Sequence, residues 1–136
     1  MDEEKTLVWI GSSKKDLLKM PEDVRRTIGY VLGKVQNGES DEAIKFLTGR
    51  KEFKGGKVRE ICDDEGGDTY RSVFTVEHEE AVYILHCFQK KSKRGIETPQ
   101  EDIDRIIERL KAVDRFRASV DGLNLIASCK ADKTRQ

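Results

Sequence analysis

Four basic side chains directly follow the most apolar segment of this chain and are its best candidates for anion chemistry. Residues 81–88 form an almost wholly apolar run that is short, rich in β-branched and aromatic types, and free of Gly and Pro. Such a run is typical of a strand buried on both faces of a sheet. No acid occurs between Glu80 and Glu97, so the strand is expected to end in concentrated positive charge from Lys90, Lys91, Lys93 and Arg94. A solvated basic loop would explain the same charges without a function.

Two arginines, Arg59 and Arg71, interrupt other strand-like segments. A charged group inside a sheet needs an acidic partner, solvent or a bound anion. Each arginine is therefore interpreted in two ways. It either contacts a substrate or forms a structural ion pair with a nearby acid such as Glu60 or Asp68.

His86 and Phe88 lie within the apolar run and are also candidates for a functional role. Histidine titrates near neutral pH and suits proton transfer, and a phenylalanine at a strand end can stack on a nucleic-acid base. Core packing explains both residues as well. His86 is flanked by Leu85 and Cys87, so a satisfied core histidine is the simpler interpretation, and Phe88 can close the core.

Charge and cysteine content narrow the class of protein. The 136 residues include 26 basic and 26 acidic side chains, so the formal net charge is zero. Proteins that coat nucleic acid non-specifically are usually strongly basic, so any polyanion contact here is expected to be local. Three cysteines without CxxC spacing favour reduced thiols in the cytoplasm. The acidic N-terminus and short apolar runs predict neither a secretory signal nor a membrane span.

No metal or other cofactor is expected. The residues that could bind a metal have no familiar zinc spacing; they are Cys62, His78, His86 and Cys87.

The elements that must position these residues predict one α+β domain with a small, mainly antiparallel sheet. In chain order they are a strand, a helical hairpin, three antiparallel strands and an amphipathic helix, over residues 6–10, 13–20, 22–36, 57–63, 69–76, 81–88 and 99–115. Residues 39–56 are expected to be irregular. Thr98 is expected to cap the last helix, with Pro99 at its first position and Glu101 completing a capping box.

The domain is expected to cover residues 1–116. Residues 117–136 lose clear periodicity and predict a C-terminal extension that is partly disordered. Within it, Leu123, Leu125 and Ile126 could dock as a short element.

This order of elements, together with four short strings, resembles the RelE/ParE superfamily and most closely its HigB-like, phage-derived branch. The strings are Val58-Arg59-Glu60-Ile61, Tyr70-Arg71, Leu85-His86-Cys87-Phe88-Gln89-Lys90-Lys91-Ser92, and Thr98-Pro99 before an isoleucine-rich helix. The stretch from Leu85 to Thr98 is quite specific, whereas the helical hairpin is generic. The resemblance covers about residues 6–115.

The resemblance implies the toxin of a type II toxin–antitoxin pair, neutralised by a cognate antitoxin. HigB- and RelE-like members cleave mRNA in the ribosomal A site without a metal, as the ribose 2′-oxygen attacks the adjacent phosphorus. The reaction needs a base, cations facing the phosphorane and an acid for the 5′-oxygen. Arg59 and Arg71 are then expected to hold the scissile phosphate. Lys90 or Lys91 is expected to transfer protons, and His86 is a further candidate. The expected RNA contacts are Lys54, Lys57, Phe88, Lys93 and Arg94.

Two alternatives stay open. ParE-like members of the same fold poison DNA gyrase and lack these cations, and a degenerate member would be a non-catalytic binding module. The cations favour the ribonuclease, whereas the zero net charge departs from the basic character of RelE-type ribonucleases. The expected partners are an antitoxin, the ribosome and mRNA, with no membrane and no DNA except through the antitoxin.

Overall fold

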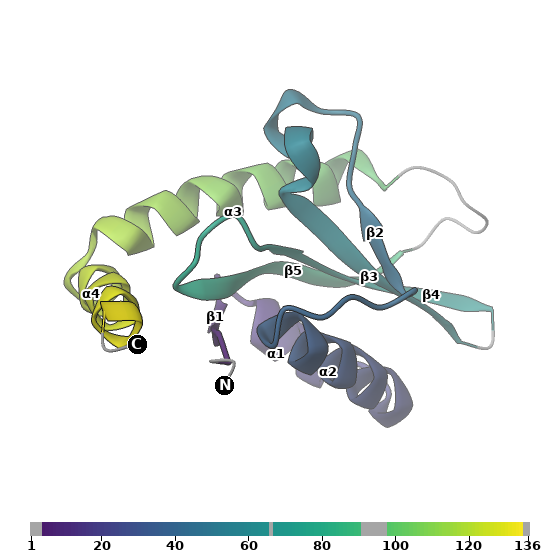
Figure 1. Cartoon of the computed structure of the whole chain (residues 1–136). Helices are drawn as coiled ribbons and strands as arrows, with labels where there is room; N and C mark the ends of the chain where they lie inside the picture. Colours follow the sequence, from purple (N-terminus) through teal and green to yellow (C-terminus); the bar gives the residue numbers. More distant parts are fainter. Residues whose placement is uncertain (1–3, 66, 91–97, 135–136) are drawn as a thin grey trace.

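The computed structural model describes residues 4–65, 67–90 and 98–134, and this part of the chain forms a five-stranded sheet with helices on both faces (Figure 1). The elements in chain order are β1 (Thr6–Trp9), α1 (Ser13–Leu18), α2 (Glu22–Gln36), β2 (Ile44–Phe46), a 3₁₀ segment (Lys51–Gly56), β3 (Val58–Glu65), β4 (Asp68–Thr75), β5 (Ala81–Lys90), α3 (Gln100–Ala118) and α4 (Val120–Thr134). The predicted α+β class is confirmed.

The strand order is β1-β5-β4-β3-β2. Strand β1 pairs with β5 in parallel, and the other neighbours are antiparallel. The predicted three-stranded meander is therefore confirmed as β3, β4 and β5. Every residue of the apolar run 81–88 is buried, as expected for a strand inside the sheet.

Two apolar clusters hold the layers together, one on each face. Helices α1 and α2 cover one face, here called the hairpin face, and α3 covers the other, here called the α3 face (Figure 1). The hairpin-face cluster includes Val24, Ile28, Ile61, Phe74 and Ile84, and the α3-face cluster includes Val58, Val73, Tyr83, Leu85 and Ile106.

A β-bulge in the middle of β5 decides which side chains face α3. Val73 of β4 pairs with His86 and Phe74 pairs with Ile84, so Leu85 is an extra residue without a partner on β4. Leu85 packs in the α3-face cluster, and the next residue, His86, hydrogen-bonds to α3. Two consecutive side chains thus share a face, which is the usual effect of a bulge. From this point alternation also turns Phe88 and Lys90 towards the α3 face.

Two expectations about helix and strand boundaries are wrong. Helix α3 begins at Gln100, with Pro99 at the N-cap and no side-chain cap hydrogen bond, so Thr98 and Glu101 form no capping box. The backbone carbonyl of Pro99 instead accepts from the amides of Asp102 and Ile103. The segment 39–56, expected to be irregular, contains β2, because Ile44–Phe46 pair with β3 at the sheet edge.

The C-terminal extension differs most from expectation, because α4 is helical over Val120–Thr134. It packs against the end of α3 after a tight corner at Ser119, whose backbone amide donates to the carbonyl of Phe116. The corner requires glycine at position 122: a Cβ on Gly122 would lie 2.0 Å from the Phe116 carbonyl oxygen. A boundary at residue 116 stays a prediction.

Candidate functional site at the end of strand β5

The cations that the sequence suggested for a single site are divided between the two ends of the sheet. Lys90 pairs with Thr69 at one end of β4, whereas the carbonyl of Lys57 accepts the Thr75 hydroxyl at the other end. These ends are about 20 Å apart, at roughly 3.3 Å per residue. Lys54 is exposed in the 3₁₀ segment that precedes β3, on the Lys57 side.

Arg59 and Arg71 lie on opposite faces of the sheet. Arg59 pairs with Phe74, whereas Arg71 pairs with Cys62. Directly paired residues share a face, and residues three apart along a strand do not, so Arg59 and Cys62 point in opposite directions. The Arg59 guanidinium lies over the Phe46 ring at 5.1 Å, and its Nε donates to the Gly56 carbonyl at 3.0 Å. Arg59 and Arg71 were expected to hold one phosphate together. Two side chains on opposite faces of a sheet cannot do so.

Four of the predicted residues do lie together, on the α3 face near the C-terminal end of β5. Arg71 pairs directly with Phe88, and Lys90 follows two positions farther along the same strand. The Phe88 ring stacks on the His86 ring with a centroid separation of 4.6 Å. Lys90 is half-buried, and the other three are buried. We call Arg71, His86, Phe88 and Lys90 the β5-end site.

Two carboxylates on β3 balance the positive charge of Arg71. Its Nη1 donates to Asp64 Oδ1 at 2.8 Å and to the Tyr70 carbonyl at 2.9 Å, and its Nε lies 3.8 Å from Glu60 Oε1. Burial acts to lower the pKa of Arg71, but the hydrogen bond that Arg71 donates to Asp64 and the negative charges around the guanidinium outweigh burial and raise the pKa. The guanidinium therefore stays charged. Of the two acids suggested from the sequence, Glu60 is within ion-pair reach, whereas Asp68 accepts from Gln89.

Both ring nitrogens of His86 face partners from α3. Nε2 lies 2.7 Å from Asp102 Oδ1, and Nδ1 lies 3.4 Å from Arg109 Nη1. Because a carboxylate only accepts and a guanidinium only donates, Nε2 carries the proton and Nδ1 is the acceptor. Burial lowers the pKa of His86, and the charges of Arg109 and Arg105 lower it further against the effect of Asp102. The ring is thus neutral, with no nitrogen facing a substrate.

The arginine that completes this network, Arg109, is a residue that the sequence reasoning missed. Its Nη1 donates to the Leu85 carbonyl, and its Nη2 donates to the Ser12 hydroxyl. Gly11, with φ of +57°, gives it room, because a Cβ there would lie 2.8 Å from Arg109 Nε. The signal in the sequence was an arginine on the buried stripe of α3, between Ile106 and Val113.

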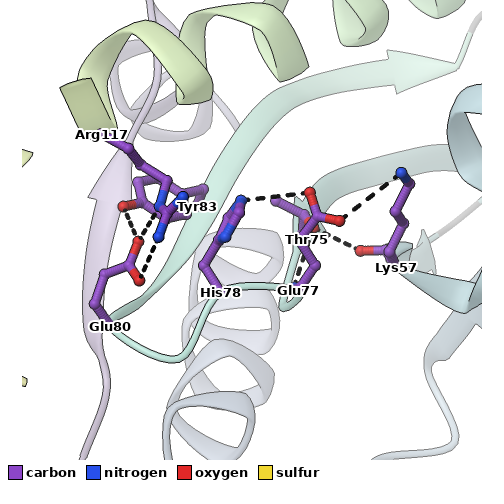
Figure 2. A network of polar contacts seen from close by, with 7 residues as sticks. All are labelled: Lys57, Thr75, Glu77, His78, Glu80, Tyr83 and Arg117. Atoms are coloured by element: carbon purple, nitrogen blue, oxygen red, sulfur yellow. Dashed lines mark hydrogen bonds and ion pairs between the residues drawn. The ribbon is translucent and has the colours of Figure 1, made fainter. Parts of the chain in front are cut away.

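A second polar network lies at the opposite end of the sheet, where β5 begins (Figure 2). The buried Glu80 accepts from Tyr83 at 2.7 Å and from Arg117 Nε at 2.7 Å. Burial acts to raise the pKa of Glu80, but these hydrogen bonds outweigh it and lower the pKa. The network fixes the end of α3 to the start of β5.

Beside this network lies a cavity of about 280 Å³, bounded by residues 77–80, Arg117, and Ile126 and Cys129 of α4. Glu77 at its rim lies 3.8 Å from Lys57 Nζ and 3.3 Å from His78 Nε2 (Figure 2). The contact with His78 lacks hydrogen-bond geometry. Lys57 is therefore tied to this end of the sheet, away from the β5-end site.

Three predicted residues, Lys91, Lys93 and Arg94, lie outside the residues that the structure describes. Within the described ranges, no three His, Cys, Asp or Glu side chains converge as metal ligands would. Cys87 instead lies on the hairpin face with its sulfur 3.3 Å from the Ser72 hydroxyl. Over the same ranges, no helix combines the length and the apolar character needed to span a bilayer.

Comparison with known proteins decides the family. The model of the phage-derived protein Gp49-like family (DUF891) matches residues 15–111, which is more than half of the chain. The chain belongs to this Gp49-like family. The family is of the RelE/HigB toxin type, in agreement with the branch that the sequence resembles. The match runs from α1 into α3, so β1 and α4 lie outside it. No curated protein and no solved structure matches the chain significantly.

Proposed function

We propose that this Gp49-like protein is the toxin of a toxin–antitoxin pair and cleaves mRNA on the ribosome, with the β5-end site as its catalytic face. Membership of a toxin family supports the first part. One observation carries the second: Arg71, Phe88 and Lys90 meet on one face at one end of the sheet. A cognate antitoxin, the ribosome and mRNA are the partners of this proposal.

The proposed reaction is attack of the ribose 2′-oxygen on the adjacent phosphorus, with release of the 5′-oxygen. Lys90 is half-buried at the strand end, where its ammonium can approach a phosphate or exchange a proton. The Arg71 guanidinium faces the developing phosphorane charge. Phe88 supplies an aromatic surface beside them. His86 positions Phe88 and α3 rather than transferring protons, because both of its ring nitrogens are occupied.

Replacing one of two matched lysines tests this site. Lys90 and Lys57 are both half-buried at strand ends, but they lie at opposite ends of the sheet. With programmed ribosomes and mapping of mRNA 5′ ends, Lys90→Ala is expected to slow cleavage about 100-fold, in the range found when a charge-stabilising donor is lost. Lys57→Ala is expected to cleave within about twofold of wild type. Equal effects of the two variants, or intact mRNA with folded wild-type protein, would refute the proposal.

A non-catalytic binding module is the second candidate, and the pairing of Arg71 favours it. Asp64 and Glu60 already neutralise this arginine, so its charge is partly used within the fold. Such a module predicts normal growth on induced expression without an antitoxin. Growth arrest together with intact mRNA would direct attention to gyrase, and a supercoiling assay with purified protein would test that alternative.

A further inference from the structure

The acidic end of β3 contacts the proposed phosphate-binding arginine directly. Arg71 Nη1 donates to Asp64 Oδ1 at 2.8 Å, and Glu60 Oε1 lies 3.8 Å from Arg71 Nε on the same face. The three residues alternate along β3 and its partner strand, with Arg71 opposite Cys62, between the two acids. This arrangement places two carboxylates where an anionic substrate would meet the guanidinium.

Asp64 is the more accessible of the two acids. Its side chain is 60% exposed, whereas the side chains of Arg71 and Glu60 are 8% and 13% exposed. Solvent therefore reaches the Asp64 carboxylate much more easily than the guanidinium behind it. An anion that approached Arg71 Nη1 from this side would take the place that Asp64 now fills.

Neighbouring carboxylates balance the charge of the Arg71 guanidinium, but not all of its N–H groups are hydrogen-bonded. Among the described residues, Arg71 Nε and Glu60 Oε2 are both buried without a hydrogen-bond partner. A guanidinium binds a phosphate best through two parallel N–H donors, a fork that a single carboxylate oxygen on Nη1 does not occupy. A phosphate diester that replaced Asp64 could engage the parallel donors Nη1 and Nη2 together, whereas a single oxygen of Asp64 now contacts Nη1.

We propose that the Asp64 carboxylate is an internal competitor for the substrate phosphate at Arg71, which limits RNA binding until the phosphate displaces it. The inference rests on the proposed function, because it takes the ligand of Arg71 to be an RNA phosphate. Asp64 is the middle residue of three consecutive acids in the sequence, residues 63–65. In this proposal, Asp64 sets the affinity of Arg71 for an RNA phosphate.

Asp64→Asn and Asp68→Asn form a matched pair for the test. Both remove one negative charge from the same hairpin, but Asp68 contacts Gln89 and not Arg71. The probe is a short single-stranded RNA with 2′-O-methyl groups, which binds without being cleaved, followed by fluorescence anisotropy. Asp64→Asn is expected to bind it about two- to fivefold more tightly than Asp68→Asn, the range of an exposed ion pair. Equal affinity of the two variants, or weaker binding by Asp64→Asn, would overturn the inference.

A second measurement shows whether Arg71 is responsible for the tighter RNA binding expected of Asp64→Asn. In NMR titrations with the same RNA, the Nε–H signal of Arg71 is expected to shift at lower RNA concentration in Asp64→Asn than in Asp68→Asn. This readout avoids replacing Arg71, whose loss would leave Glu60 buried without its partner. An unchanged Arg71 signal in both variants would overturn the inference. Cleavage on ribosomes is scored separately: tighter binding by Asp64→Asn with no cleavage by any variant refutes the ribonuclease and leaves the competition standing.

Discussion

Replacing His86 separates a positioning role from proton transfer. His86→Gln keeps an N–H donor close to the place of Nε2, so the hydrogen bond to Asp102 can persist, but glutamine cannot act as an acid or base. His86→Ala removes the donor and the ring together. The other histidine of the chain, His78, lies beside Tyr83 at the opposite end of β5, so His78→Gln is the matched control.

The magnitudes follow from the contacts of the ring. The hydrogen bond at 2.7 Å to the Asp102 carboxylate is of a kind that contributes about 2 kcal/mol to the free energy of unfolding. Stacking on Phe88 at 4.6 Å adds about 1 kcal/mol. His86→Ala is therefore expected to lose about 3 kcal/mol and His86→Gln about 1 kcal/mol, or roughly 9 °C and 3 °C in melting temperature for a chain of this length.

The assay pairs thermal melts with cleavage on programmed ribosomes at a temperature where all variants are folded. His86→Gln is expected to cleave within about threefold of wild type, because loss of a general acid or base normally costs about 100-fold or more. A rate loss of that size in His86→Gln, with an unchanged melting temperature and with His78→Gln active, would refute the positioning role. It would make His86 a catalytic residue despite its two occupied nitrogens.

Two further predictions concern stability. Burial lowers the pKa of His86 from its ordinary value of 6.5, so below that pH the unfolded chain binds more protons and stability falls as pH falls. Thermal melts across this window are expected to show the loss in wild type and in His78→Gln but not in His86→Gln; a parallel loss in all three would contradict the assignment. Arg117→Ala leaves the buried Glu80 carboxylate without its ion pair and, since the Arg117 side chain is 31% exposed, is expected to cost about 2 kcal/mol. The melting temperature is expected to fall by roughly 6 °C in Arg117→Ala and to change little in Arg115→Ala, which replaces an exposed residue of the same helix. Similar shifts in both variants would show that the ion pair between Arg117 and Glu80 contributes nothing to stability.

The elements that could be predicted well from the sequence are those whose apolar pattern allows only one interpretation. Helix α2 spans Glu22–Gln36 as predicted, because its apolar stripe is regular and Asn37-Gly38 ends it. Strand β5 was predicted because residues 81–88 are almost all apolar, and all eight are buried in the structure. Helix α4 was missed because its apolar side chains point both ways: Val120 and Leu123 are exposed, whereas Leu125 and Ile126 are half-buried. Without a single stripe, periodicity gives no helix signal.

The candidate site depended on two features of register that the sequence does not reveal. The bulge at Leu85 lies inside a run where almost every residue is apolar, so one extra residue leaves no trace in the pattern. It nevertheless decides that His86, Phe88 and Lys90 face α3 rather than the helical hairpin. The pairing of β3 with β4 places Arg59 and Arg71 on opposite faces, and a shift of one residue would have placed them together.

The zero net charge of the chain is better understood from the pairing of charges than from their total. Arg71 lies against Asp64 and Glu60, so the β5-end site carries its own counter-charges. Total charge therefore says little about the field that a phosphate would meet at this face. If total charge governed RNA binding, Asp64→Asn and Asp68→Asn would strengthen it equally. If local pairing governs it, only the acid that touches Arg71 matters, and Lys90→Ala weakens binding while Lys57→Ala, at the far end of the sheet, does not.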